Sequence, residues 1–333
     1  MKKRLKIESP NELLELAIGY QRSQVLFSFV ELEIPKFLSE KILTAKELAE
    51  KLEIDPIAME RFLNACACAG LLEQENNKYR NAELAEYFLV KGGKFYLGGQ
   101  IKRYQNRSYP LWTSLTEKLK TWKYGETNTE TPEEEDQGAD SMAEQHNLAL
   151  LHGYALGKAF DFSKYKRVLD LGGGTGAMSI GLCETFPNLR ATVFDLPENA
   201  EKADKFISES NLQARIETVG GDITKDQLPD GFDVALLANL VSVFDAETNK
   251  KLFSDIYKKL PENGVCIISG WIMDENRLSP EVSVLFCLED ICWQSPDVEK
   301  NFSVYKSWLE EVGFKKIEYK VYLEPTRMIC AFK

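Results

Sequence analysis

The chain has 333 residues, of which 44% are hydrophobic and 28% charged, as is usual for globular proteins. This composition excludes wholesale disorder, and no apolar run reaches the roughly 18 residues that a membrane span needs. The 41 basic and 52 acidic residues give a net charge of −11, which disfavours non-specific binding to nucleic acid. We therefore expect about two domains and neither a nucleic-acid nor a membrane partner.

The cysteines and histidines narrow the chemistry further. The seven cysteines are an odd number and form no paired CxxC clusters, which indicates reduced thiols in a cytoplasmic protein. The only two histidines are His146 and His152, so we expect no histidine-rich metal site. The same scarcity leaves few candidates for a general base.

Residues 1–100 read as mostly helical. A capping box of Thr44 and Glu47 starts one helix, and Asp55 caps another. Apolar spacing and these caps predict helices over Asn11–Val30, Ala45–Leu52 and Pro56–Ala69, and a short hairpin over Leu71–Arg80. Two short helices followed by a hairpin predict a winged helix-turn-helix domain.

The rest of the chain changes character twice. Residues 101–160 read as connecting helices around an acidic stretch, Tyr124–Asp140, which we interpret as a solvated loop. From residue 161 to 333, short apolar runs alternate with helical stretches: Val168–Leu171, Ala191–Phe194, Ile216–Val219, Val234–Leu237 and Val265–Ser269. This alternation predicts an α/β domain with a doubly wound, mostly parallel sheet. Lys316–Val321 and Met328–Phe332 are expected to add an antiparallel pair at its edge.

The most informative motif is the glycine-rich segment Val168-Leu-Asp-Leu-Gly-Gly-Gly-Thr-Gly176, which a strand enters and a helix leaves. Glycines permit a tight turn and let the backbone approach a ligand closely. The helix N-terminus offers N–H groups to that ligand. The pattern by itself also fits the dinucleotide fingerprint GxGxxA, so an NAD-dependent oxidoreductase remains an alternative.

Three acidic residues favour S-adenosylmethionine (SAM) over NAD. Asp170 stands two residues before the first glycine, where a carboxylate suits the cationic amino group of SAM and repels a pyrophosphate. Asp195 ends the second strand, where an acid accepts ribose hydroxyls. Asp222 ends the third strand and is placed to accept the adenine amine. The alternative is that these acids only cap loops.

With VLDLGGGTG, Phe194-Asp-Leu-Pro197 and Gly221-Asp222 in this order and spacing, almost the whole chain resembles the winged-helix small-molecule O-methyltransferases. That family includes hydroxyindole O-methyltransferase and many enzymes of secondary metabolism. The resemblance implies a class I methyltransferase domain that binds SAM and an N-terminal domain that forms a homodimer. The expected cofactor-binding residues are Asp170, Gly172, Gly173, Gly174, Asp195, Leu196, Asp222, Ile223 and Ala238. The expected substrate-binding residues are Met142, Ile291 and Ser295.

The family pattern breaks after the fourth strand. The family has a His-Asp-Trp segment there, whose histidine takes the acceptor's proton, whereas this chain has Ser242 and Phe244 at the histidine and tryptophan positions. A serine hydroxyl is not a general base near neutral pH. The acceptor can ionise unaided or present a nucleophilic carbon or nitrogen. Another residue can supply the base, and His146 shares a helical face with Met142. Finally, SAM can be bound for another purpose.

We therefore expect a SAM-dependent methyltransferase of a small, aromatic metabolite, with His146 and Ser242 as the candidate catalytic residues and catalysis mainly by orientation. An aromatic acceptor is expected because Trp112, Trp122, Trp271, Phe286 and Trp293 cluster in segments that border the family's acceptor pocket. The alternatives are a SAM-binding enzyme without methyl transfer and a SAM-responsive DNA-binding regulator. Against the regulator, the expected recognition helix has only one basic residue, Arg61.

Overall fold

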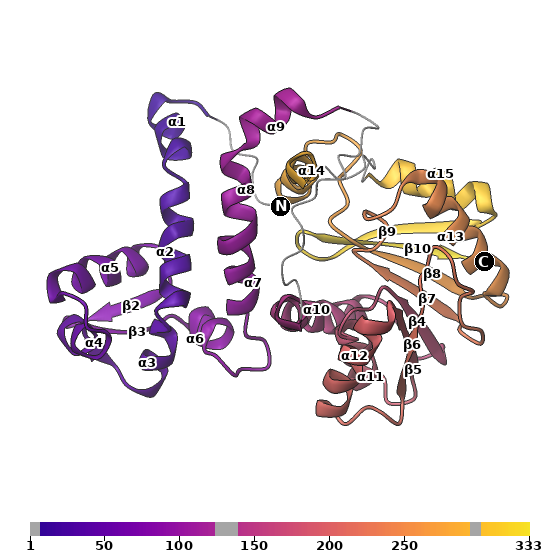
Figure 1. The fold of residues 1–333 in the computed structure, drawn as a ribbon, viewed down its shortest axis with the longest axis horizontal. Coiled ribbons are helices and arrows are strands. Elements are labelled where there is room, and N and C mark those ends of the chain that lie inside the picture. Colours follow the sequence, from indigo (N-terminus) through magenta and orange to yellow (C-terminus); the bar gives the residue numbers. More distant parts are fainter. Residues whose placement is uncertain (1–6, 124–138, 294–300) are drawn as a thin grey trace. The chain divides into compact units, whose positions relative to one another are not determined.

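The computed structural model describes residues 7–123, 139–293 and 301–333, with the side chains of residues 139–143 left out (Figure 1). The fold divides into two compact units, one ending at Pro110 and the other starting at Leu111. None of the helices in the described ranges is both long and apolar enough to cross a membrane.

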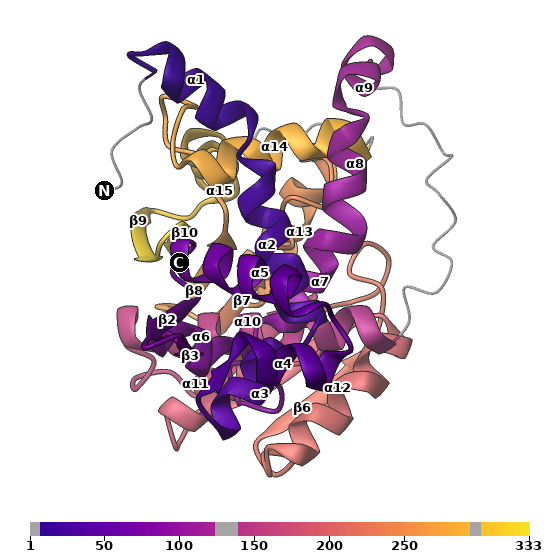
Figure 2. The ribbon, with the colours of Figure 1, turned by 90° about the vertical axis from the view of Figure 1, so that its left-hand side faces the viewer.

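The first unit packs short helices around a small sheet (Figure 2). Its helices are α1 (Pro10–Ala17), α2 (Tyr20–Glu31), α3 (Ile34–Glu40), α4 (Ala45–Leu52), α5 (Pro56–Cys68), α6 (Glu83–Leu89), α7 (Gly98–Arg103) and the π-helix η1 (Tyr104–Ser108), and α8 (Tyr109–Thr113) begins at its end. Its antiparallel sheet has the order β1 (Leu43–Thr44), β3 (Lys78–Asn81), β2 (Leu72–Glu75). The core includes Phe29, Leu48 and Leu63, all fully buried.

The predicted caps of this unit are confirmed. Thr44 Oγ1 accepts a hydrogen bond from the Glu47 N–H. In return, the Glu47 carboxylate accepts a hydrogen bond of 2.7 Å from the Thr44 N–H. Asp55 caps α5, and Asn76 and Asn77 turn the β2–β3 hairpin in the left-handed region. These local signals carry over because they depend only on neighbouring residues.

The single helix expected over Asn11–Val30 is wrong, because the structure ends α1 at Ala17 and starts α2 at Tyr20. The Ile18 N–H donates to carbonyls of the last turn of α1, and Gly19 follows as the weakest helix former at the joint. The two helices then differ in burial. Phe29 on α2 is fully buried, whereas α1 has no buried residue.

The second unit is built on a seven-stranded sheet (Figure 1). The strand order is β6 (Ile216–Gly220), β5 (Arg190–Asp195), β4 (Arg167–Leu171), β7 (Val234–Ala238), β8 (Val265–Gly270), β10 (Thr326–Phe332), β9 (Lys316–Leu323). The first five strands run parallel, and β10 pairs antiparallel with β8 and β9. The predicted α/β class and all seven predicted strands are therefore confirmed.

Helices cover both faces of this sheet. The helices are α9 (Leu115–Thr121), α10 (Ala139–Ala159), α11 (Ala177–Thr185), α12 (Pro197–Glu209), α13 (Ala246–Lys259), α14 (Glu281–Trp293) and α15 (Phe302–Val312). Leu169 and Leu171 of β4 join the core that α13 and α15 cover. Because side chains alternate along a strand, Asp170 between them points to the opposite face, where α11 packs.

Candidate functional site

The glycine-rich turn after β4 adopts a conformation that glycine alone takes easily. Gly172, Gly174 and Gly176 lie in the left-handed region, with φ of 64°, 56° and 71°. Gly173 leaves no space for a side chain, since an added Cβ would stand 2.9 Å from Asp170 Cγ and from Val193 Cγ1. The turn thus exposes backbone rather than side chains at the carboxyl edge of the sheet, where ligands bind in open α/β folds.

Asp195, at the end of β5, ties this turn to the next helix. Its Oδ2 accepts a hydrogen bond from the Gly174 N–H at 2.8 Å. Its Oδ1 accepts from the Leu196 N–H at 2.7 Å and from Asn199 Nδ2 at 2.8 Å. Asp195 as a whole residue is only 8% exposed. It is therefore held in one orientation at the boundary between the turn and α12.

Asp170 is fully buried beneath the turn. Its Oδ2 accepts a hydrogen bond from the Ser179 hydroxyl at 2.7 Å, whereas its Oδ1 has no partner in the described structure. Burial raises the pKa of Asp170 to about 7, although the hydrogen bond from Ser179 acts in the opposite direction. A buried carboxylate oxygen without a partner is costly, and a nearby cationic ligand group would compensate it.

Asp222 follows β6, and its carboxylate accepts hydrogen bonds from residues of the same loop. Its Oδ1 accepts hydrogen bonds from the Thr224 N–H at 2.9 Å and from the Thr224 hydroxyl at 2.6 Å, and its Oδ2 accepts from Lys225 at 2.7 Å. The Lys225 hydrogen bond, with those of Thr224, lowers the pKa of Asp222 to about 2. Ile223 packs against the core of the sheet. The expected contact of Asp222 with adenine remains a prediction.

The residues at this edge fit SAM. Gly173 has no room for a side chain, Asp195 is held in one orientation, as the predicted contact with ribose hydroxyls requires, and the unpaired oxygen of Asp170 lies below the turn, where a cation would be favoured. Leu196 is 42% exposed at the start of α12, and Ala238 ends β7 half-buried. These two apolar positions leave surface for an apolar part of the ligand.

His146 contacts the same edge from α10. Its Nδ1 lies 2.8 Å from the Thr175 hydroxyl oxygen, and its ring stacks on Phe206 of α12 with ring centroids 4.2 Å apart. Burial lowers the pKa of His146 to about 4. His152, two turns further along α10, stands edge-on to Tyr322 of β9 instead. The histidine nearest to the glycine-rich turn is therefore neutral at pH 7.

Ser242 lies in the loop after β7, at a different part of the edge. Its hydroxyl donates to the Asn239 carbonyl at 3.4 Å, and the side chain is half-buried. Asn239 itself has a left-handed φ of 55° and donates its N–H to the Ser269 carbonyl. No described contact joins Ser242 to His146, so the two candidate catalytic residues are not brought together.

Aromatic side chains gather around α14. Phe286 meets Trp271, which follows β8, edge to face with centroids 5.0 Å apart. Trp112 and Trp293 donate their indole N–H groups to the two oxygens of Glu289, each at 3.1 Å. These contacts place several flat apolar surfaces on one side of the unit.

The three expected substrate-binding residues are only partly described. Ile291 is half-buried on α14. Met142 belongs to α10, but its side chain is among those left out, and Ser295 lies outside the described residues. Their roles remain predictions.

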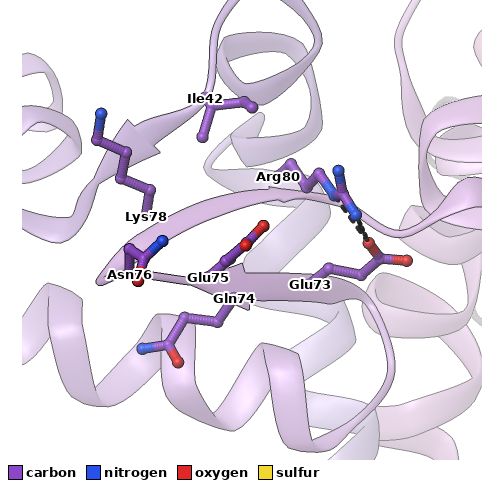
Figure 3. A pocket seen from close by; sticks show the side chains of 7 residues that line it. All are labelled: Ile42, Glu73, Gln74, Glu75, Asn76, Lys78 and Arg80. Carbon is purple, nitrogen blue, oxygen red and sulfur yellow. Dashed lines mark hydrogen bonds and ion pairs between the residues drawn. The ribbon is translucent and has the colours of Figure 1, made fainter.

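A shallow cavity occurs on the small sheet of the first unit (Figure 3). It is lined by Ile42, Glu73, Gln74, Glu75, Asn76, Lys78 and Arg80. Arg80 Nε donates to Glu73 at 2.7 Å across the β2–β3 hairpin. The lining of the cavity contains none of the residues expected to bind SAM.

The described part of the chain contains neither a metal cluster nor a disulfide. Within the described ranges, no three His, Cys, Asp or Glu side chains are grouped to hold a metal ion. All seven cysteines fall in these ranges, and none forms a disulfide.

Four residues of the site were missed from the sequence. Asn199 and Ser179 follow Asp195 and Asp170 by four and nine residues, and a search for donors on the next helix would have found them. Thr175 lies within the glycine motif, but its partner His146 is 29 residues away. Phe206 carried no signal, because only the packing of α12 brings it to His146.

The comparisons with known proteins agree with this geometry. The family model described as O-methyltransferase domain matches residues 113–315, and that of the O-methyltransferase dimerisation domain matches residues 14–91. A Streptomyces sahachiroi protein named 3-hydroxy-5-methyl-1-naphthoate 3-O-methyltransferase is 29% identical over 331 residues, 95% of this chain and 92% of that protein. The N,N-dimethyltransferase OxyT of Streptomyces rimosus is 28% identical, with 93% and 92% covered.

A solved structure gives the same result. Human N-acetylserotonin methyltransferase in complex with SAM matches with a TM-score of 0.85 and 26% identity, over 99% of both chains. The family match extends over more than half of the chain, and it confirms the resemblance inferred from the glycine-rich turn and the two following motifs. The chain therefore belongs to the O-methyltransferase family and is a SAM-dependent methyltransferase of small molecules.

Proposed function

We propose that this enzyme methylates a planar, aromatic small molecule, with a hydroxyl oxygen as the preferred methyl acceptor. The carrying observation is the aromatic surface of α14 and its neighbours, in particular the edge-to-face pair of Trp271 and Phe286 at 5.0 Å. Trp271 directly follows β8, so this surface adjoins the carboxyl edge of the sheet. Aromatic walls bind flat ligands through stacking and apolar burial.

The cofactor-binding residues in this proposal are the nine named from the sequence. Asp170 offers a negative charge beneath the turn, Asp195 orients the ribose, and Asp222 with Ile223 flanks the adenine. When bound, SAM supplies an electrophilic methyl group on its sulfonium. The chain's own contribution is to align the acceptor with that methyl group, and Ile291, Met142 and Ser295 are proposed to line the acceptor's position.

Catalysis in this proposal needs no protein base at Ser242. A serine hydroxyl does not accept a proton near pH 7, and the hydroxyl of Ser242 is turned to the Asn239 carbonyl. A phenol or enol acidic enough to ionise in water would react without help. The same feature supports nitrogen as a second acceptor, because an uncharged amine carries its own nucleophilic lone pair. Carbon methylation remains open on the same ground.

The active assembly is proposed to be a homodimer formed through residues 1–100. Leu13, Leu14 and Leu16 of α1 are 56–64% exposed, and the dimerisation family model covers all but Leu13. Uncovered apolar surface of this kind marks an interface. Light scattering at micromolar concentration should give twice the mass of one chain. A monomer would contradict this assembly.

We expect the enzyme in the cytoplasm.

The test is a screen of small molecules with SAM, followed by mass spectrometry of the products. The set pairs each phenol with the aniline and the non-aromatic alcohol of the same carbon skeleton. Methylation of phenols above the other two supports the proposal, and methylation of anilines alone favours the nitrogen alternative. Preference for the non-aromatic alcohols would overturn the aromatic proposal.

A further inference from the structure

His146 contacts both the glycine-rich turn and the helix α12. His146 lies on α10, which precedes β4, the first strand of the large sheet in chain order. On one side, Thr175 belongs to the glycine-rich turn after β4. On the other, Phe206 belongs to α12, the helix that follows Asp195. One imidazole thus contacts both the turn and α12, the helix that follows Asp195.

The turn needs such a contact because its backbone is intrinsically loose. Three of its five residues between Gly172 and Gly176 have left-handed backbone angles, which only glycine adopts without strain. Within the site, the Gly174 N–H donates to Asp195, and the Gly176 N–H closes the turn on the Gly173 carbonyl. Thr175 is the one residue of the turn with a side chain that reaches another element, and it is 5% exposed.

The hydrogen bond itself indicates how His146 acts. The Thr175 hydroxyl can donate a hydrogen bond to His146 Nδ1, which is 2.8 Å from the hydroxyl oxygen. If Nδ1 accepts this hydrogen bond, the single proton of the neutral ring is on Nε2, which then cannot take a proton from a substrate. Stacking on Phe206 at an interplanar angle of 20° fixes the ring plane. Burial of the ring lowers its pKa.

We propose that His146 is a positioning residue of the cofactor site, which holds the glycine-rich turn against α12 through Thr175 and Phe206, and that it is not the base that deprotonates the acceptor. This inference rests on SAM binding and not on the identity of the acceptor. The proposal gives α10 a role in cofactor binding, whereas the sequence motifs for the cofactor lie only at the ends of β4, β5 and β6.

The first experiment is a double-mutant cycle on SAM affinity, measured by calorimetry with SAM and with its demethylated product. His146→Phe keeps the ring for Phe206 but removes the hydrogen bond, and Thr175→Val removes it from the other side. We expect each variant to bind about 3–10-fold more weakly, and the double variant to bind no more weakly than either one. His152→Phe, on the same helix but against Tyr322, is the matched control with unchanged affinity.

Two outcomes overturn the proposal at this stage. Unchanged SAM affinity in His146→Phe, with an unchanged melting temperature, would show that the contact does not position the turn. Fully additive losses in the double variant would show that His146 and Thr175 act separately. Both readouts work without an acceptor, so failure of the acceptor screen does not affect them.

The second experiment observes the imidazole directly. Since the chain has only two histidines, nitrogen-15 NMR resolves both, and the His152→Phe variant assigns them. We expect His146 to be neutral at pH 7 with its proton on Nε2. A proton on Nδ1 would leave Nε2 free to accept a proton and would overturn the exclusion of His146 as the base. Loss of about 10³-fold in turnover at saturating SAM in His146→Phe, with unchanged affinity, would identify His146 as that base and overturn the proposal.

Discussion

The ends of β4 and β5 differ from the ends of β7 and β8 in the kind of polar group that they carry. The first pair ends in carboxylates that the protein holds in place, with Asp195 accepting three hydrogen bonds and Asp170 buried below the turn. The second pair ends in neutral groups, the amide of Asn239 and the hydroxyl of Ser269, which is 2.7 Å from the Tyr322 hydroxyl.

In the proposed function, this difference separates recognition of the cofactor from recognition of the acceptor. Fixed carboxylates suit a ligand with a positive charge and several hydroxyls, whereas neutral groups beside aromatic rings suit a flat apolar one. The ends of β4 and β5 carry acidic side chains that the protein holds in place. At the ends of β7 and β8, we expect recognition to depend on the shape of the ligand. The predictions below test each pair of strand ends in turn.

The largest effect is expected in the pH dependence of the free energy of unfolding, which should differ between the wild type and Asp170→Asn. Because burial raises the pKa of Asp170 from 3.8 to about 7, the folded state binds more protons than the unfolded state between these pH values. The free energy of unfolding should therefore fall as pH rises from about 4 to 7, by on the order of 3–4 kcal/mol for this group. In Asp170→Asn this fall should be absent.

Urea unfolding of the ligand-free protein at a series of pH values measures this difference. Ser179→Ala sharpens the test, because the Ser179 hydrogen bond lowers the pKa of Asp170. Removing it should extend the fall to higher pH. Parallel curves for wild type and Asp170→Asn would mean that Asp170 is not held in a buried, protonated form.

Asp195→Ala should weaken SAM binding by about 10–100-fold, or ~1.5–3 kcal/mol, because it removes hydrogen bonds of a charged acceptor. It also releases the Gly174 N–H from its 2.8 Å contact. Calorimetry with SAM measures the loss, and Glu198→Ala, exposed on the first turn of α12, is the control. Binding as tight as in the wild type would disprove the assignment of the site to this edge.

Gly174→Ala should reduce SAM affinity by about tenfold. Its φ of 56° costs an alanine roughly 1–2 kcal/mol, and the turn can relieve this strain only by leaving Asp195. Gly231→Ala is a matched control, since Gly231 also has a positive φ, 83°, with open space around it. That variant should lose similar stability but bind SAM normally. Equal affinity losses in both would point to general destabilisation.

The smallest effect is expected for Ser242→Ala, which should keep turnover within about tenfold of wild type, under ~1.4 kcal/mol of barrier. The Ser242 hydroxyl donates to the Asn239 carbonyl, and the Ser307 hydroxyl on α15 donates in the same way to the Val304 carbonyl at 2.9 Å. Ser307→Ala is therefore the control for loss of such a hydrogen bond. Single-turnover methyl transfer measures both. A loss of 10³-fold with unchanged SAM affinity would mean that Ser242 relays a proton or orients the acceptor.

Most of the large sheet could be predicted because each strand is a short apolar run between helical stretches. The β4 and β5 strands begin within one residue of their predicted starts, and the Thr44 capping box is found as expected. Asn11–Val30 could not be predicted correctly, since its apolar spacing continues across the joint at Ile18 and Gly19. Periodicity records which face is apolar and not where a helix stops.

The sequence by itself determined the glycine-rich turn and the acids that end β4, β5 and β6, because their backbone angles and spacing are local properties of the chain. Only the tertiary structure decided how these groups are used. Asp195 accepts a hydrogen bond from the Gly174 N–H, which lies 21 residues earlier in the chain, and Asp170 is buried under the turn by the packing of α11. His146 meets Thr175 and Phe206 because three elements converge, and contacts between residues distant in the chain leave no periodic trace in the sequence.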